Sequence, residues 1–598
     1  MTTHRYFALL AFDPATRLAW EAAYARVIAE AGTFAVQNVG PRVVVIAEQN
    51  GLVAIGDQGA VVGRLHARQS TTTLHTFDAE AARMAVRTQG ASLLRACWGS
   101  YVAFIATSAE DGVHVLRSPF GDLGCYWARS PFGILVGSDI DLLRRFGGYS
   151  LKVLWSAVVR HLVASDLHAQ QTCLEGLNEL LGGERLSDRA GRYTVDKPWR
   201  VWDFVDADVR IRDADEAADS VRDAVQASVA AQARSHSKIL LRLSGGLDSS
   251  IVAASLAKTE TPCVAVTMVT RDRGGDERRH AQSVARHMGI PLSEVIRSTD
   301  LVDLAVSEAR TLPRPTARAF AQASLYVASA LARQYGATAI FDGGGGDNMF
   351  AALQSPAPVA DCLYRTGGWG HFWRTARSIG IAADTGTAYV ARRAIWRAAT
   401  RGPANRWHAD LRLLSSKACA MARGATDHPW LVPPKGVLPG SAAHVALLVA
   451  ASSVVQSRDP QTAIPLCSPL ITQPVAEACL RVPSWLWTQD GQNRAVARNA
   501  FRGVLPSGIC DRRDKGLPDS FLIELIEVNH RQISSMLFDG LLAAEGLIDT
   551  AALAETMHPA RLAKGAGYIR VMQLVDTEAW VRSMLLQAQS LTRLSVPS

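Results

Sequence analysis

The sequence predicts a mixed α/β protein of at least two domains, with antiparallel sheets in the first part and a doubly wound parallel sheet in the second. The chain has 598 residues, more than one hydrophobic core usually organises. Short β-type runs broken by Gly, Asp and Ser dominate residues 1–205, whereas strands alternate with helices in residues 206–598. We therefore expect one domain over each range, and a mostly helical part beyond residue 350.

Six runs in the first part have the composition of strands, and helical patterns are few there. These runs are Tyr6–Ala11, Arg42–Ala47, Val53–Ile55, Tyr101–Thr107, His114–Arg117 and Gly133–Val136. The tract Lys197–Arg210 is typical of a connector between the two parts.

The second part begins with an Ala-rich helix over Ala214–Ala233. The expected strands are Lys238–Leu243, Val264–Val269 and Thr338–Phe341, and the expected helices begin near Ser249 and span Glu277–Met288 and Ala319–Tyr335. The apolar run Ser441–Val455 is too short to cross a bilayer and carries His444, so we expect a buried core helix and no membrane contact.

Composition fits a folded protein, because 48% of the residues are hydrophobic and 20% are charged. The net charge of +8 favours an anionic partner without choosing among ATP, an acidic peptide and nucleic acid. Nine cysteines without a CxxC pair argue against a zinc ribbon or a thioredoxin-like site. Sparse cysteines and the lack of a signal-peptide pattern together predict a cytoplasmic protein.

The segment LRLSGGLDSS, residues 241–250, carries the strongest chemical signal because it follows an apolar strand and opens a helix. Gly245 and Gly246 let backbone N–H groups approach an anion, and the helix N-terminus adds partial positive charge. Asp248 beside a phosphate implies an intervening Mg²⁺. The candidate nucleotide-binding residues of this loop are Leu243, Ser244, Gly245, Gly246, Asp248, Ser249 and Ser250.

This loop is not a Walker A loop, because no GK[ST] follows its glycines. The missing lysine argues against transfer of the γ-phosphoryl group. A glycine-rich turn between a strand and a helix, with no ligand, is the plain alternative.

A second loop, IFDGGGGDN over residues 340–348, follows another predicted strand. Ligands of an open parallel sheet bind beyond the carboxyl ends of its strands, so the two loops are expected to face one site. Asp347 then becomes a second Mg²⁺ candidate beside Asp248. By itself the second loop fits a flexible turn equally well. Its candidate nucleotide-binding residues are Asp342, Gly343, Gly344 and Gly345.

A third segment, LPSGICDRRDKG over residues 505–516, contains two basic candidates. Lys515 is a candidate for stabilising negative charge that develops during the reaction, and Arg513 is a candidate for a phosphate contact. A surface lysine after the end of a helix is the alternative.

Together the three segments resemble the asparagine synthetase superfamily. SGGLDSS at 244–250 is similar to the PP-loop of ATP pyrophosphatases, FDGGGGDN at 341–348 takes the place of that family's SGEGADE, and 505–516 resembles its lysine-containing segment. Ile464–Pro469 and the strand around Val266, which resembles the strand that contacts adenine, also fit. The resemblance implies a carbon–nitrogen ligase that uses ATP and Mg²⁺ and forms AMP and pyrophosphate.

The N-terminal part resembles the family's class II glutaminase domain, which implies an N-terminal-nucleophile (Ntn) type α+β sandwich. The matching stretches are Leu93–Ile105, Leu116–Trp127, Ile134–Leu143 and Leu174–Leu186. A working glutaminase has cysteine after the initiator methionine, but this chain has Thr2 and lacks the motifs RGPD and NGEIYN. Threonine can be an N-terminal nucleophile. The missing motifs nevertheless favour a degenerate, inactive domain that supplies no ammonia.

Gly344 stands where asparagine synthetases have Glu and β-lactam synthetases have Tyr, and we expect it to open space above the adenylate. GGGGDN is similar to the corresponding loop of lasso peptide cyclases. Those enzymes adenylate an Asp or Glu side chain of a leader-cleaved precursor and close a macrolactam with its N-terminal amine. This resemblance implies a precursor peptide as substrate, and a leader peptidase and a leader-recognition protein as partners.

Two other functions stay open. One is a small-molecule amide ligase of the asparagine or β-lactam synthetase type. The other is a non-catalytic or RNA-binding PP-loop protein, although nucleic acid is the less favoured partner because no RNA-binding motif is present.

The tract Arg374–Arg412 gathers eight arginines, with Trp396 and Trp407 among them and Trp373 at its edge. Such a tract could dock a precursor peptide or the leader peptidase. We favour the alternative of solvated helices with the tryptophans packed inward.

Overall fold

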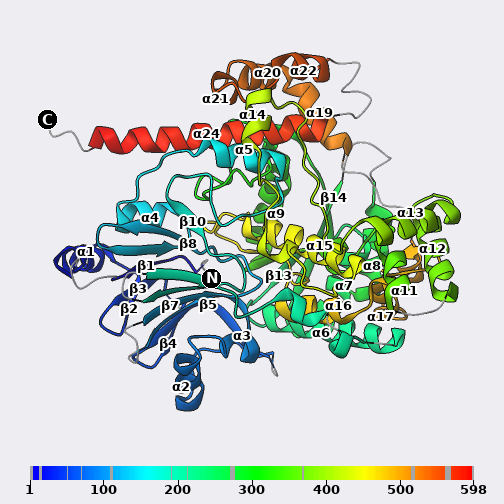
Figure 1. Ribbon diagram of the computed structural model, residues 1–598, viewed down its shortest axis with the longest axis horizontal. Coiled ribbons are helices and arrows are strands. Elements are labelled where there is room, and N and C mark those ends of the chain that lie inside the picture. The colour runs from blue at the N-terminus through cyan, green and yellow to red at the C-terminus, as the bar shows by residue number, and fades with distance from the viewer. Residues whose placement is uncertain are drawn as a thin grey trace.

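Two six-stranded antiparallel sheets, packed face to face, form the N-terminal part of the molecule (Figure 1). The structure is a computed structural model and describes residues 4–11, 17–49, 51–68, 71–107, 112–189, 192–205, 207–211, 213–269, 276–365, 369–512, 519–558 and 567–594. One sheet has the order β10-β8-β9-β1-β3-β2 and the other β12-β11-β7-β6-β5-β4.

The first sheet contains β1 (Tyr6–Leu10), β2 (Ala35–Val39), β3 (Val43–Ala47), β8 (Tyr126–Ser130), β9 (Gly133–Gly137) and β10 (Leu177–Glu179). The second contains β4 (Leu52–Ile55), β5 (Gly59–Ala67), β6 (Cys97–Thr107), β7 (Gly112–Arg117), β11 (Arg185–Arg189) and β12 (Arg192–Asp196). Side chains alternate along each strand, so Tyr6 and Ala8 of β1 lie between the sheets while Phe7 and Leu9 face outward.

Helices cover the outer faces of both sheets, which makes a helix–sheet–sheet–helix sandwich (Figure 1). Helix α4 (Ile140–Gly147) packs on the first sheet with α1 (Arg17–Glu30) against it, and α2 (Ala79–Arg87) and α3 (Leu93–Ala96) pack on the second. Helix α5 (Trp155–Val163) contacts helices of the second part of the chain. The expected α+β sandwich with antiparallel sheets is confirmed, and all six expected strands are present. The expectation of few helices is wrong, because these five helices lie in that part.

The second part is built on a five-stranded parallel sheet of order β15-β14-β13-β16-β17. Its strands are β13 (Ile239–Arg242), β14 (Cys263–Val269), β15 (Leu292–Ile296), β16 (Ala339–Phe341) and β17 (Leu466–Cys467). Helix α9 (Gln322–Tyr335) packs on one face, and α6 (Ala214–Ala233), α7 (Leu247–Leu256) and α8 (Arg278–Met288) on the other. Helices on both faces confirm the doubly wound arrangement, and α6 has the predicted bounds.

Beyond residue 350 the chain is mostly helical, as expected. The helices after β16 are α10 (Gly346–Met349), α11 (Ala357–Arg365), α12 (Trp369–Ala382), α13 (Thr387–Thr400), α14 (Ser416–Met421), α15 (Pro439–Gln456), α16 (Gln473–Arg481), α17 (Ala495–Ala500), α18 (Ser507–Cys510), α19 (Asp519–Val528), α20 (His530–Phe538), α21 (Leu541–Ala544), α22 (Thr550–Thr556) and α24 (Tyr568–Leu594). A two-stranded ribbon, β18 (Thr488–Gln489) and β19 (Gln492–Asn493), precedes α17.

Helix α15 contains the apolar run singled out in the sequence. Within the described part of the chain it is the one helix long and apolar enough to cross a membrane, and 78% of it lies buried inside the structure. It packs against α10 and α16, so the expected core helix is confirmed.

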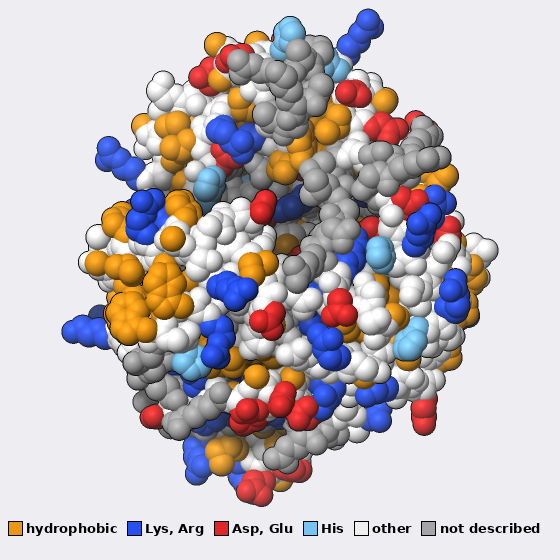
Figure 2. Space-filling model, turned by 90° about the vertical axis from the view of Figure 1, so that its right-hand side faces the viewer, with side chains coloured by type: hydrophobic (Ala, Val, Ile, Leu, Met, Phe, Trp, Pro, Cys, Tyr) orange, Lys and Arg blue, Asp and Glu red, His pale blue; other side chains and the backbone are white. Residues whose placement is uncertain are grey.

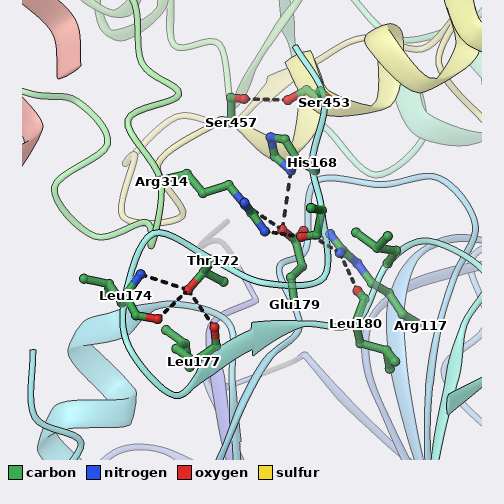
Figure 3. Close-up of polar contacts among 12 residues, drawn as sticks. Arg117, His168, Thr172, Leu174, Leu177, Glu179, Leu180, Arg314, Ser453 and Ser457 are labelled. Carbon is green, nitrogen blue, oxygen red and sulfur yellow. Dashed lines mark hydrogen bonds and ion pairs between the residues drawn. The ribbon is translucent and has the colours of Figure 1, made fainter. Parts of the chain in front are cut away.

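A buried ion cluster joins the N-terminal sandwich to the second part (Figure 3). Glu179 on β10 pairs with Arg117 on β7 at 2.8 Å and with Arg314, from the segment before α9, at 3.2 Å. His168 lies 3.5 Å away. Burial would raise the pKa of Glu179, but His168, Arg314 and Arg117 hold it well below its ordinary value. The carboxylate is therefore charged at neutral pH and links both sheets to the second part.

Helices α11 to α13 form a side lobe with its own small core. Figure 2 views the molecule from the side on which this lobe lies in Figure 1, and hydrophobic side chains there adjoin Lys and Arg. Trp369, Trp373 and Trp396 are 43–65% exposed, and Arg393 and Arg401 lie over the Trp396 ring. The expectation that Trp373 and Trp396 pack inward is therefore wrong.

Candidate functional site

The first glycine loop connects β13 to α7 at the carboxyl edge of the parallel sheet. Gly245 has φ +74°, and a Cβ there would lie 2.6 Å from the Cβ of His280 on α8, so glycine is required. Gly246 is the N-cap of α7, which points the helix N-terminus at the loop. The strand–turn–helix arrangement predicted from the sequence is present.

The serines of this loop divide into two kinds. The Ser244 hydroxyl is on an exposed residue, contacts the Ser249 hydroxyl at 3.1 Å and accepts from the Gly246 N–H at 3.3 Å. The Ser250 hydroxyl is fully buried and donates to the Gly246 carbonyl at 2.7 Å. Ser244 is therefore placed to meet a ligand, whereas Ser250 holds the first turn of α7.

The second glycine loop packs directly on the first. A Cβ at Gly343 would lie 2.7 Å from the backbone carbon of Asp248, and one at Gly346 would lie 2.7 Å from the Asp248 Oδ1. Any larger residue would push the loops apart, which explains the glycines better than flexibility does. The expectation that both loops face one place is met by the fold.

One guanidinium joins the two expected metal carboxylates. The Arg494 Nη1 lies 2.9 Å from the Asp248 Oδ1 and 2.5 Å from the Asp347 Oδ1. Arg494 precedes α17, has φ +55° and is 8% exposed. The carboxylates of Asp248 and Asp347 are also a donor set that suits Mg²⁺, because this ion binds one or two carboxylates together with phosphate oxygens. In the described residues no group of three or more His, Cys, Asp or Glu side chains could hold a metal.

Sequence reasoning missed Arg494. It follows the tight turn Asp490-Gly491 of the β18–β19 ribbon, where both residues have positive φ. No motif around Arg494 in the sequence indicates a role in binding or catalysis. Its left-handed backbone conformation and its contacts with two acids far away in the chain become visible only in the fold.

Leu243 and Val266 lie behind the loop. The Leu243 N–H donates to the Val266 carbonyl at 2.9 Å, and both side chains are 1% exposed. Both side chains pack in hydrophobic cores. A contact with adenine by Val266 stays a prediction.

Gly344 faces a small polar network in place of open space. A Cβ there would meet the Ser468 Oγ at 2.8 Å and the Asp342 Oδ1 at 2.9 Å. Asp342 accepts from the Gly344 N–H at 3.0 Å and from the Ser468 hydroxyl at 2.5 Å, and Arg458 donates to Ser468. The space that a side chain would take at this position is thus filled by Ser468 and Asp342, which corrects the expectation of an opening.

The third segment reaches the same edge of the sheet. Arg512 donates to Glu277 at 2.9 Å, directly before α8, and α18 contacts α7. Arg513 and Lys515 lie outside the described residues, as does Thr2, so their roles stay predictions.

A cavity of about 610 Å³ lies beside the second loop, between the two parts of the molecule. Arg242 and Asp342 line it from the ends of β13 and β16, with Asp342 3.7 Å from Arg242. Such a volume is within the ordinary range of ligand sites, about 300–1,000 Å³. The candidate site therefore has a loop side, suited to phosphates, and a cavity side.

Comparison with known proteins identifies the family. The family model described as asparagine synthase matches residues 220–456 and 459–582, more than half of the chain. Among curated proteins, none matches the chain.

Two solved structures each overlap with 49% of the chain. One, described as the allosteric regulatory enzyme of purine biosynthesis, is 11% identical, covered over 80% of its length, with TM-score 0.21. The other, glutamine phosphoribosylpyrophosphate amidotransferase from B. subtilis complexed with ADP and GMP, is 10% identical, covered over 81%, with TM-score 0.20. Scores this low carry no conclusion. The family match does: it supports an ATP-dependent amide ligase, and the chain belongs to the asparagine synthase family.

Proposed function

We propose that this chain is an ATP- and Mg²⁺-dependent ligase that closes a macrolactam in a peptide, as lasso peptide cyclases do. It would adenylate an Asp or Glu side chain of a leader-cleaved precursor and join it to the peptide's own N-terminal amine. Partners under this proposal are the precursor peptide, a leader peptidase and a leader-recognition protein.

The convergence of Asp248 and Asp347 on one guanidinium carries the ligase part of the proposal. ATP phosphates bind well to backbone N–H donors, a helix N-terminus and a cation. In support of the proposal, the glycine N–H groups, the N-terminus of α7 and two carboxylates that could hold Mg²⁺ lie where the two glycine loops touch. The absence of a Walker lysine from the loop favours cleavage between the α- and β-phosphates.

The residues take defined roles in this scheme. Ser244 and the backbone of Gly245 and Gly246 bind the phosphates that leave as pyrophosphate. Mg²⁺, held by Asp248 and Asp347, would neutralise phosphate charge. A peptide carboxylate attacks the α-phosphorus of ATP and pyrophosphate leaves; the N-terminal amine then attacks the acyl carbon and AMP leaves. Lys515 would stabilise the negative charge that develops, and Arg513 would contact phosphate.

Holding the amine and the acyl carbon on one chain supplies much of the rate. Well-oriented intramolecular reactions reach effective molarities of about 10⁵–10⁸ M. An α-amine has a pKa of about 8, so a substantial neutral fraction is present near neutrality without a dedicated base.

Two observations favour a peptide over a free amino acid. The cavity of about 610 Å³ beside Asp342 is roomy for a single amino acid. The sequence also lacks the glutaminase motifs that would supply ammonia. An amine carried by the substrate itself meets the need for a nucleophile.

The test is mass spectrometry of synthetic peptides, each with a free N-terminal amine and one internal Asp or Glu, incubated with the enzyme, ATP and Mg²⁺. We expect a product lighter by one water, with one AMP formed per ring closed. AMP formation with free amino acids and no peptide would instead establish a small-molecule ligase. RNA binding without any AMP formation would contradict the ligase.

A further inference from the structure

The cavity beside the second loop has walls from both parts of the molecule. The parallel sheet contributes Arg242 and Asp342, helix α9 contributes Ser329 and its neighbours, and the N-terminal sandwich contributes Arg64 and Asp122. Helix α24 closes another side with Gln573 and Asp576. The sandwich is thus part of the cavity and does not merely lie against the second part.

The sandwich wall is polar and held rigidly. Asp122 accepts from the Ser100 hydroxyl at 2.6 Å, and the Leu123 N–H donates to the same hydroxyl at 2.9 Å. Arg64 on β5 lies 3.9 Å from Asp122. A Cβ at Gly121 would lie 2.7 Å from the Ser100 Cα, so the loop that carries Asp122 packs tightly on β6. The cavity therefore meets a fixed pair of opposite charges.

These charges are poorly explained by interdomain packing alone. Burying ionic groups between two domains is costly even when they are paired, and apolar side chains would pack at less cost. Arg64 and Asp122 keep 20% and 30% of their side chains exposed, and both line the cavity. Burial would raise the pKa of Asp122, but Arg64, the Ser100 hydroxyl and Arg458 lower it, so the carboxylate stays charged.

The opposite wall repeats the pattern and leads to the nucleotide loops. Arg242 and Asp342 form a second pair of opposite charges, and Asp342 accepts from the backbone N–H of Gly344. Apolar groups lie among the cavity-lining residues, among them Leu325, Ile464 and Tyr326, which is 59% exposed. A ligand that carries an amine, a carboxylate and apolar side chains matches this lining, and a peptide has all three.

We propose that this cavity is the peptide-binding chamber of the ligase and that Arg64 and Asp122 of the N-terminal sandwich bind the peptide. The inference rests on the proposed function and extends it, because it gives a use to a domain that lacks the glutaminase motifs. The sandwich orients the peptide, and the second part performs the chemistry.

The test separates peptide binding from ATP binding. The probe is a pool of synthetic peptides, each with a free N-terminal amine, one internal Asp or Glu and a C-terminal fluorophore, followed by fluorescence anisotropy. ATP affinity is measured separately with a fluorescent ATP analogue. The variants are Arg64→Ser, Asp122→Asn and Ser329→Trp, where the last fills the chamber from α9 without removing a charge. Arg87→Ala, on an exposed residue of α2, is the matched control.

We expect Arg64→Ser and Asp122→Asn to weaken peptide binding by about tenfold, the size of a lost charge-assisted hydrogen bond. Ser329→Trp should weaken it at least as much, and ATP affinity and the Arg87→Ala variant should stay near wild type. In turnover the KM for peptide should rise while the KM for ATP does not. Thermal unfolding shows whether each variant is folded. If Arg64→Ser or Asp122→Asn does not fold, Ser329→Trp still tests whether the peptide binds in the chamber.

Wild-type peptide affinity in all folded chamber variants, together with AMP formation by the wild type, would overturn the chamber and leave the ligase standing. A wild type that forms no AMP with any peptide would overturn the proposed function. In that case, weakened peptide binding in the chamber variants would still show that the peptide binds in this cavity.

Discussion

Two clusters of arginine and carboxylate have similar chemistry and opposite surroundings. Where the two glycine loops touch, Arg494 bridges Asp248 and Asp347, whose side chains are 14% and 42% exposed. Between the two parts of the molecule, Arg117 and Arg314 hold Glu179, with side-chain exposures of 2%, 6% and 0% (Figure 3). The sealed cluster cannot change partners without opening the fold, whereas the half-open one can exchange a guanidinium for another cation. We therefore expect the first to act in catalysis and the second in stability.

Replacing either site carboxylate should give the largest effect. We expect Asp248→Asn or Asp347→Asn to lower the rate of AMP formation by about a thousandfold, because charge that develops on phosphate loses its counter-cation. The free energy of unfolding should change little by comparison. Product AMP is measured by chromatography, with Asp215→Asn in the first turn of α6 as the control. Full activity in either variant would show that the replaced carboxylate does not hold the metal.

The sealed cluster should show the reverse behaviour. Glu179→Gln leaves two buried guanidinium groups without their carboxylate, so we expect a loss of about 3–5 kcal/mol in the free energy of unfolding. At a temperature where the variant is folded, its kcat for AMP formation should stay within about twofold of wild type. Urea unfolding measures the loss. The control is Glu175→Gln, which breaks an exposed pair with Lys152 and should cost at most about 1 kcal/mol.

Arg494 should link the two behaviours. We expect Arg494→Ala to lower the free energy of unfolding in metal-free buffer by about 1–3 kcal/mol, because two acids lose the guanidinium they share. Added Mg²⁺ and ATP should then stabilise this variant more than they stabilise wild type, since no guanidinium has to be displaced. Calorimetry with and without Mg²⁺ and ATP measures both effects. The control is Arg502→Ala, because Arg502 forms an exposed pair with Asp511. Equal stabilisation of both proteins would deny that Arg494 and the metal compete.

The prediction furthest from the two clusters concerns a buried acid that accepts hydrogen bonds from neutral donors. Asp361 accepts from the Gly440 N–H at 2.8 Å and the Ser484 hydroxyl at 2.6 Å, and burial raises its pKa from 3.8 to about 7. A raised pKa means that the fold favours the protonated acid, so its contribution to stability is present at low pH and lost as pH rises toward about 7. Relative to Asp361→Asn, wild type should therefore be more stable near pH 3.8 than near pH 7. Thermal unfolding of both proteins at several pH values in between measures the difference in stability. A difference that does not change with pH would contradict the raised pKa of Asp361.

The two glycine loops were predictable because their signals are local. SGGLDSS and GGGGDN each follow an apolar strand, and the carboxyl ends of parallel strands meet at one edge. Helix α6 was predictable with its bounds, because Ala-rich helical periodicity runs its whole length. In contrast, α1 was missed because only Ala23 and Val27 on it are buried, which leaves little periodicity to detect.

The features that could not be predicted depend on residues far apart in the chain. Arg494 meets Asp248 across 246 positions, and Arg314 meets Glu179 across 135. No spacing rule relates such residues, so the bridging guanidinium, the sealed cluster and the cavity walls became visible only in the fold. The filled space beside Gly344 has the same origin, because Ser468 directly follows β17 and lies 126 positions after Asp342.

Under the proposed function, Asp248 and Asp347 together hold one metal–nucleotide complex. The most direct measurement is calorimetric titration with MgATP of wild type, Asp248→Asn, Asp347→Asn and the double variant. We predict that each single change weakens binding and that the double change weakens it by much less than the sum, because both side chains serve one ion. Additive losses, or unchanged affinity in either single variant, would contradict the account.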